Sequence, residues 1–167
     1  MSESKTHNVL FLCTGNSARS ILAEALLNVL GGGRFRAFSA GSNPSGRVQP
    51  FAADLAEQLG YSRDDLRSKA WDEFAKPDAP AMDMIITVCD NAAGEACPVW
   101  PGHPAIAHWG VPDPAAVEGP DDVRRRAYMD AMIALRRRIE LLVALPAEKL
   151  EHLAAAHALR EIAERTA

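Results

Sequence analysis

Short apolar runs alternate with helical stripes along most of the chain, and this alternation limits the possible folds more than any other feature. Residues 8–12, 35–39, 84–88 and 105–109 each predict a short buried strand. After the first run, apolar side chains recur on one helical face at Ile21, Leu22, Ala25, Leu26 and Val29. Strands that alternate with helices predict an α/β fold, in which helices cover both faces of a mostly parallel sheet.

Two further helices are predicted before the C-terminal segment. One carries Phe51, Ala52, Leu55 and Leu59 on a single face, and the other spans residues 121–145 with an inner stripe of Tyr128, Met132, Leu135, Ile139 and Leu142. Pro146 breaks that pattern, and the alanine- and glutamate-rich residues after it favour a helix by propensity. We therefore expect one domain over residues 1–145 and a C-terminal helical extension over residues 146–167.

Size and charge exclude several classes of protein. The 167 residues suit a single core of ordinary size. A formal net charge of -4 provides no basic field for a nucleic acid or an anionic membrane. The polar N-terminus lacks the basic leader of a secretion signal, and no apolar run approaches the roughly 20 residues of a membrane helix. We expect a cytoplasmic protein.

Three cysteines, Cys13, Cys89 and Cys97, are an odd number in a domain large enough to fold without disulfides. This usage suits reduced thiols in a cytosol better than a secreted disulfide framework. The three thiols are therefore candidates for chemistry.

The segment between the first strand and the first helix is the most informative part of the sequence. It consists of Cys13, Thr14, Gly15, Asn16, Ser17, Ala18, Arg19 and Ser20. Backbone N–H groups at the start of a helix have no partners within the helix, and the helix dipole adds positive potential there. Gly15 permits a backbone conformation that other residues resist. We expect residues 14–20 to bind a tetrahedral oxyanion.

Cys13 would stand at the mouth of this loop. The N–H groups, the Arg19 guanidinium and the Ser20 hydroxyl would favour the charged sulfur, which predicts a thiolate nucleophile at neutral pH. Arg19 would fold back to hold two oxygens of the anion as a bidentate donor. The alternative is a structural cysteine beside a solvated arginine, which a Cys-x5-Arg spacing alone leaves open.

The run VLFLCTGNSARS, the SAG of residues 39–41 and the pair Asp113 and Pro114 resemble the low-molecular-weight protein tyrosine phosphatase superfamily, and more closely its arsenate reductase branch. The resemblance covers residues 9–145. It implies a three-layer fold with a four-stranded parallel sheet in the order 2-1-3-4, Cys13 as the nucleophile and Asp113 as the general acid. Without the resemblance, Asp113 between two prolines is equally typical of a turn.

In that strand order, Cys13 and Cys89 follow neighbouring strands, and ligands bind at the carboxyl edge of such sheets. The resemblance implies a relay in which Cys13 forms an adduct with arsenate, Cys89 attacks Cys13 to release arsenite, and Cys97 attacks Cys89 to leave an outer disulfide. Two alternatives remain for the second and third thiols. They are inert buried residues, or they bind zinc with His103 and His108, although the spacing lacks a short Cys-x2-4-Cys pair.

The resemblance is incomplete at a position that concerns metals. Asn16, Glu24 and Ser39 match residues that brace the loop or, in some members, help to hold a potassium ion. A further acidic ligand of that ion is replaced around Ala70 and Trp71. We therefore expect no bound metal and no cofactor.

The resemblance also separates the two branches of the superfamily. Ala115 and Ala116 stand where the phosphatase branch carries paired tyrosines, which favours a small inorganic anion as substrate. We expect reduction of arsenate to arsenite, with thioredoxin, glutaredoxin or a low-molecular-weight thiol as electron donor and phosphate or sulfate as weak competing anions. The alternatives are a phosphomonoesterase that acts through a Cys13 phosphoenzyme and a non-catalytic oxyanion or redox sensor.

Overall fold

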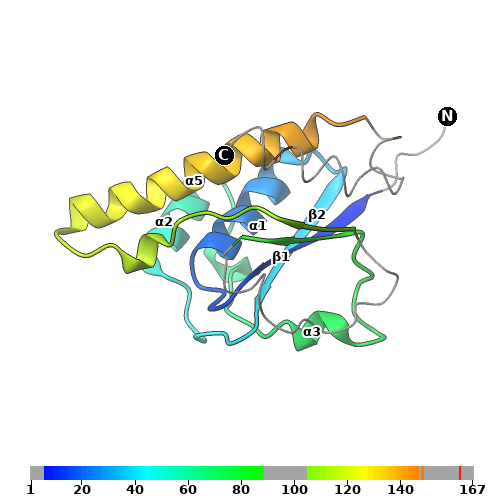
Figure 1. Ribbon diagram of the computed structural model, residues 1–167, viewed down its shortest axis with the longest axis horizontal. Helices are drawn as coiled ribbons and strands as arrows, with labels where there is room; N and C mark the ends of the chain where they lie inside the picture. The colour runs from blue at the N-terminus through cyan, green and yellow to red at the C-terminus, as the bar shows by residue number, and fades with distance from the viewer. Residues whose placement is uncertain (1–5, 89–104, 147, 149–161, 163–167) are drawn as a thin grey trace.

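The computed structural model describes residues 6–88, 105–146, 148 and 162. Within these residues, four strands form one parallel sheet in the order β2-β1-β3-β4 (Figure 1). The strands are β1 His7–Cys13, β2 Phe35–Gly41, β3 Met84–Thr87 and β4 Ala105–His108. The expected α/β fold and the strand order 2-1-3-4 are confirmed.

The helices are divided unequally between the two faces of this sheet. Figure 1 shows three of them on one face, namely α1 Arg19–Leu30, α2 Pro50–Gln58 and α5 Asp121–Val143, and the short α3 Asp72–Ala75 on the other. Two 3-10 turns, η1 Arg63–Asp65 and η2 Pro114–Ala116, lie in the connections. None of the helices in the described part of the chain is long and apolar enough to cross a membrane.

Alternate residues of β1 pack on opposite faces of the sheet, as the two-residue period of a strand requires. Val9 and Phe11 join the larger core beneath the three helices, whereas Leu10 and Leu12 join a smaller core that includes Phe74 of α3. The predicted inner stripe of the last long helix is buried at every position, namely Tyr128, Met132, Leu135, Ile139 and Leu142. A strand that is apolar on both faces therefore carries the loop that follows it.

The structure differs from the expected elements mainly where they are short. Helix α3 and the two 3-10 turns have three or four residues each, which is too few for a helical period to be visible in the sequence. Most of the predicted C-terminal helical extension lies outside the described residues and stays a prediction. Ile162 is a described residue of that segment, and it is buried in the larger core.

Three strands bring their carboxyl ends to the place where the loop begins. The register aligns Cys13, the last residue of β1, with Gly41, the last residue of β2. On the other side of β1, Val88 N donates to Leu12 O at 2.9 Å. Cys13 therefore emerges between the ends of two neighbouring strands, at the edge where open α/β sheets bind ligands.

Candidate active site

The loop after β1 is turned so that backbone amides face its centre. Three of its carbonyls accept hydrogen bonds from the chain after β2, namely Thr14 O from Asn43 N at 3.0 Å, Gly15 O from Ser45 N at 3.0 Å and Ser17 O from Gln49 N at 2.8 Å. Because the C=O and N–H of a trans peptide point in opposite directions, the amide that follows each of these carbonyls points inward. Converging amides of this kind form a concave site for an anion.

Helix α1 begins beside these amides, and neither its N-cap nor its first turn holds a group that would neutralise its dipole. Its N-cap residue, Ala18, has no side chain to accept a hydrogen bond from the first turn. The helix is described throughout, and its first turn holds no acidic residue. The positive end of the dipole is therefore directed at the loop, where it favours negative charge.

Asn16 holds the loop from behind. Its φ is 45°, a left-handed conformation that asparagine adopts more readily than most residues. Its side chain donates from Nδ2 to Ser20 Oγ at 2.8 Å and accepts at Oδ1 from Lys69 N at 2.9 Å. Asn16 and Ser20 are both fully buried, so their side chains support the backbone of the loop.

Gly41 allows β2 to approach the loop closely. A Cβ at this position would lie 2.4 Å from Thr14 O, 2.8 Å from Cys13 O and 3.0 Å from Asn16 N. All three are backbone atoms of the loop, so a side chain could be accommodated only by moving the loop itself. The glycine of the SAG motif is therefore a structural requirement of the anion loop.

A hollow of about 260 Å³ opens at the loop. Its lining is formed by Cys13, Thr14, Gly15, Ser17, Ala18, Arg19 and Asp113. Pockets for drug-sized ligands begin at roughly 300 Å³, so this hollow suits a small ion better than a large organic group. Cys13 is buried, with 5% of the residue exposed, as expected for a residue at the bottom of the hollow.

Arg19 has two of its nitrogen atoms engaged and a third available. One terminal nitrogen donates to Val111 O at 2.9 Å, and the other lies 3.6 Å from Asp113 Oδ2. Arg19 Nε is buried and has no hydrogen-bond partner among the described residues. A buried N–H without an acceptor is uncommon in native proteins, and an oxyanion in the hollow would supply one.

The segment that anchors Arg19 is itself fixed on two sides. Val111 N donates to Val88 O at 3.1 Å, and Arg138 of α5 donates to Gly110 O at 3.0 Å. Arg138 is 7% exposed, and burial lowers its pKa. The segment whose carbonyl positions Arg19 is thus held by Val88, which follows β3, and by Arg138 of α5.

Asp113 occupies a turn and also lines the hollow. Its Oδ1 accepts a hydrogen bond from Ala115 N at 3.0 Å and caps the turn η2. Its side chain is 42% exposed and lines the hollow, with Oδ2 directed at Arg19. The turn residue is therefore also a carboxyl group at the mouth of the hollow.

The structure does not test the second half of the predicted site. Cys89, Cys97 and His103 lie outside the described residues. His108 ends β4, and its Nδ1 is 2.7 Å from Thr87 Oγ1, an ordinary hydrogen bond at a strand end.

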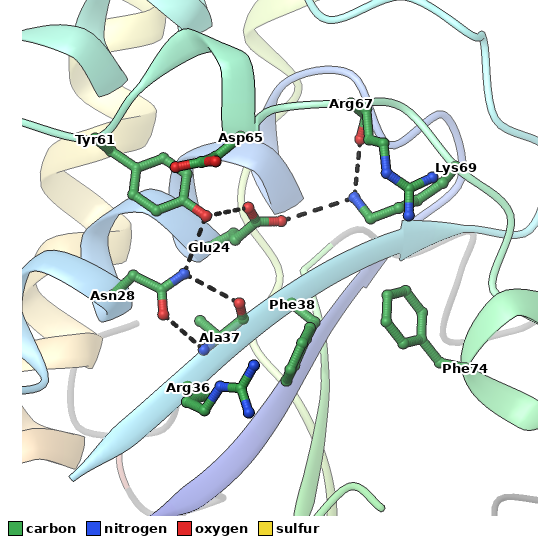
Figure 2. Close-up of a pocket in the computed structure, with 10 residues that line it drawn as sticks. All are labelled: Glu24, Asn28, Arg36, Ala37, Phe38, Tyr61, Asp65, Arg67, Lys69 and Phe74. Carbon is green, nitrogen blue, oxygen red and sulfur yellow. Dashed lines mark hydrogen bonds and ion pairs between the residues drawn. The ribbon is translucent and has the colours of Figure 1, made fainter. Parts of the chain in front are cut away.

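Behind the loop, Glu24 is the centre of a second polar cluster that sequence reasoning assigned only in part (Figure 2). Its carboxylate accepts hydrogen bonds from Ser39 Oγ at 2.6 Å and Tyr61 Oη at 2.7 Å, and it lies 3.7 Å from Lys69 Nζ. Glu24 and Ser39 were predicted to brace the loop. Lys69 and Tyr61 were missed, because each belongs to a connection with no helical or strand period.

The charges in this cluster are buried, and the pKa values of two members shift accordingly. Burial, assisted by the neighbouring Glu24 carboxylate, raises the pKa of Tyr61 well above its ordinary value, so the phenol is a neutral donor. Burial lowers the pKa of Lys69, and the negative charge of Glu24 opposes that shift. The cluster is therefore a compensated ion pair with a neutral hydrogen-bond donor beside it.

The chain matches a known family along most of its length. Residues 8–149 match the family model for low molecular weight phosphotyrosine protein phosphatases. A protein named arsenate reductase from Brevibacillus brevis is 38% identical over 133 residues, which cover 80% of this chain and 94% of that protein.

Solved structures show the same relationship. The arsenate reductase of Archaeoglobus fulgidus superposes with a TM-score of 0.64 at 28% identity, covering 82% of this chain and 99% of that one. The thioredoxin-dependent arsenate reductase of Corynebacterium glutamicum superposes with a TM-score of 0.55 at 25% identity, covering 84% and 65% respectively. The chain therefore belongs to the low molecular weight phosphotyrosine protein phosphatase family, and its similarity to these proteins places it beside the arsenate reductases of that family.

Proposed function

We propose that this protein reduces arsenate to arsenite with Cys13 as the nucleophile and that a thiol donor such as thioredoxin returns it to the reduced state. The observation that carries the proposal is the shared hollow of Cys13 and Arg19 at the uncapped start of α1. A thiolate and a tetrahedral anion are both stabilised at such a position. The names of the relatives supply the identity of the anion.

In the first step, the Cys13 thiolate attacks the arsenic atom of arsenate, and an S–As bond forms while one As–O bond breaks. Asp113, at the mouth of the hollow, protonates the departing oxygen so that it leaves as water. Arg19 and the inward amides stabilise the negative charge of the remaining oxygens. Arsenic is still in its oxidised state at this stage.

In the second step, the Cys89 thiolate attacks the Cys13 sulfur. A disulfide forms, the S–As bond breaks, and its electron pair stays on arsenic, which leaves as arsenite. The Cys97 thiolate then attacks the Cys89 sulfur, so that the Cys13 thiolate is released and the disulfide joins Cys89 to Cys97. A dithiol donor reduces this disulfide by the same exchange chemistry, and two electrons have passed from the donor to arsenic.

The described residues support this relay as far as they extend. Val88, which directly precedes Cys89 in the sequence, is hydrogen-bonded to Leu12, which directly precedes Cys13. The described chain thus reaches Val88 beside the strand that carries the nucleophile. The thioredoxin dependence named for the Corynebacterium glutamicum relative supports the choice of donor.

The test is turnover of arsenate with thioredoxin and its reductase in Cys13→Ser, Cys89→Ser and Cys97→Ser, each assayed separately. Each substitution is expected to abolish turnover, with a loss of at least about 10³-fold for Cys13→Ser because the nucleophile is removed. Mass spectrometry after arsenate treatment without a donor is expected to find a Cys89–Cys97 disulfide. Full turnover in Cys89→Ser or Cys97→Ser would contradict the relay.

The same variants separate the reductase from a phosphomonoesterase. A phosphatase needs the hollow and its acid but neither Cys89 nor Cys97. Rapid hydrolysis of a phenyl phosphate that is lost in Cys13→Ser and unaffected in Cys89→Ser, together with no arsenate turnover, would favour the phosphatase.

A further inference from the structure

Lys69 is a buried lysine that contacts the anion loop and its supporting cluster through different atoms. Its main-chain N–H donates to Asn16 Oδ1 at 2.9 Å, and its side chain is 7% exposed. Figure 2 shows the Nζ atom directed at Glu24, with Arg67 on its other side. One residue therefore joins the loop to helix α1.

The ammonium group of Lys69 has three oxygen neighbours. Nζ lies 2.8 Å from Arg67 O, 3.4 Å from Ser39 Oγ and 3.7 Å from Glu24 Oε1. A protonated lysine has three donor hydrogens and no acceptor, which matches a set of oxygen atoms. Oxygen atoms that converge on one point, with one carboxylate among them, are equally the ligand set of a hard cation.

The neighbouring cation cannot replace Lys69 in this position. The Arg67 guanidinium forms a bidentate pair with Glu73, at 2.9 and 2.7 Å, on the exposed side of the same connection. The Glu24 carboxylate is 5% exposed, and a buried carboxylate without a cation is strongly unfavourable. Lys69 is the residue that compensates Glu24 among those described around it.

We propose that Lys69 is a built-in cation, which replaces a bound potassium ion at Glu24 and Ser39 and thereby positions the anion loop through Asn16. Some members of this family use the matching residues to help hold potassium, but here the ammonium group occupies the space between them. A metal ion at the same point would stand against the positive charge of Lys69, so the residues present do not fit potassium. The protein is therefore expected to be indifferent to potassium.

The role of Lys69 is one of positioning, because it contacts neither Cys13 nor the hollow. Loss of its charge would leave Glu24 uncompensated, and the strain would reach the loop through α1 and through the main chain at position 69. The inference depends on the proposed function only for the anion-binding role of the loop. Its tests use melting temperature and sulfate binding, neither of which requires arsenate turnover.

The first experiment compares the melting temperatures of the wild type and Lys69→Met in equal concentrations of KCl and choline chloride. The wild type is expected to melt at the same temperature in both salts. Lys69→Met opens the cation position, so potassium is expected to raise its melting temperature by about 2–4 °C over choline through binding to the folded state. Lys76→Met, which removes an exposed lysine, is the control and is expected to behave as the wild type.

The second experiment measures how well sulfate protects Cys13 from alkylation by iodoacetamide, with sulfate added as its choline or potassium salt. In choline, Lys69→Met is expected to bind sulfate at least about fivefold more weakly than the wild type, the lower end of ordinary coupling between sites. Potassium is expected to restore most of that loss. A merely structural lysine would give a loss that potassium does not repair.

A double variant, Glu24→Gln with Lys69→Met, keeps the experiment decisive if the single variant does not fold. Because both charges are removed together, the double variant is expected to fold and to be insensitive to potassium. An unfolded double variant would overturn the proposal. A potassium response in the wild type, or none in a folded Lys69→Met, would overturn it as well.

Discussion

The protein has two polar sites on either side of the same loop, and they differ in how their charges are satisfied. In the hollow of Cys13, Arg19 retains a buried Nε without a partner in the described chain, and the dipole of α1 is uncapped. In the cluster behind the loop, Glu24 has a cation and two hydroxyl donors within 3.7 Å. The first site, called the open site below, has polar groups that a ligand could satisfy. In the second, called the supporting cluster, the polar groups are satisfied by one another.

The unsatisfied groups identify the open site, and not the supporting cluster, as the candidate active site. A pocket of about 430 Å³ adjoins the supporting cluster and is larger than the hollow of about 260 Å³ at Cys13. Size alone would therefore select the wrong site. The informative property is whether the polar groups at the surface of the pocket already have partners, because satisfied groups gain little from a ligand.

The largest effect of a change at the open site, short of losing the nucleophile, is expected at Arg19. Arg19→Gln removes the charge and should reduce turnover by about 10²–10³-fold, the loss typical of a donor that stabilises developing negative charge. Arg19→Lys keeps the charge but not the planar fork, so it should recover only a small part of the loss. Steady-state kinetics with arsenate and sulfate binding at Cys13 measure both.

The control for this prediction is Arg137→Gln, because Arg137 is an exposed arginine of α5. It should leave turnover and sulfate binding unchanged. If Arg19→Gln bound sulfate as tightly as the wild type, Arg19 would serve only to hold the Val111 carbonyl. The open site would then lack the anion-binding group that distinguishes it from the supporting cluster.

A smaller effect is expected for Asp113→Asn, a change in the carboxyl group of the open site. The Asn side chain can still accept the hydrogen bond of Ala115 N, so the turn η2 should persist. Turnover should fall by about 10²-fold because the proton donor is lost, whereas sulfate binding should be unchanged or tighter. An equal loss of turnover and sulfate binding would show that Asp113 only shapes the loop; Asp122→Asn, at an exposed position, is the control.

The sequence predicted the open site far better than the supporting one, for a physical reason. Residues 13–20 form one continuous segment, so the chemistry of the loop can be identified where the strand ends and the helix begins. The cluster at Glu24 draws on α1, β2 and two connections, and the Ser39–Lys69 contact spans 30 residues of sequence. No local pattern marks Lys69, because its role exists only after β2 and the connection have met.

The fold shows the same division. Apolar periods predicted four strands and three long helices, which the structure confirms, while the strand order came from the resemblance and not from the periods. The short helix α3 had no signal of its own, since only Phe74 within it is buried. The Cys89 and Cys97 relay stays a prediction, because it depends on residues outside the described chain.

Gly41→Ala is expected to damage the open site by moving its backbone. The added Cβ would meet three backbone atoms of the loop at 2.4–3.0 Å, so we expect a loss of about 1–3 kcal/mol in the free energy of unfolding, as for other overpacked sites. Sulfate binding should weaken in parallel. Denaturant unfolding measures the first effect, and Arg36→Ala at an exposed position of the same strand is the control.

The smallest expected effect is at Tyr61 in the supporting cluster, and it depends on pH. Tyr61→Phe removes the hydrogen bond to Glu24 and should cost about 1 kcal/mol at neutral pH. In the wild type, the pKa of Tyr61 is raised above its ordinary 10.0. The stabilisation is therefore complete below pH 10 and is lost as the pH rises above 10, because the unfolded chain then releases a proton that the folded protein retains.

The contribution of Tyr61 to the pH dependence is the difference in stability between the wild type and Tyr61→Phe at each pH. Lys69, whose folded pKa is lowered, gives the opposite slope over a range that ends near its ordinary 10.5, but it is present in both proteins and cancels. Asn28 and Asp65, the other groups that influence Tyr61, also cancel. The stability curves of the wild type and Tyr61→Phe should therefore converge above pH 10. If they stayed parallel, the phenol would not be held neutral by its burial beside the Glu24 carboxylate, and the supporting cluster would be less closed than its geometry indicates.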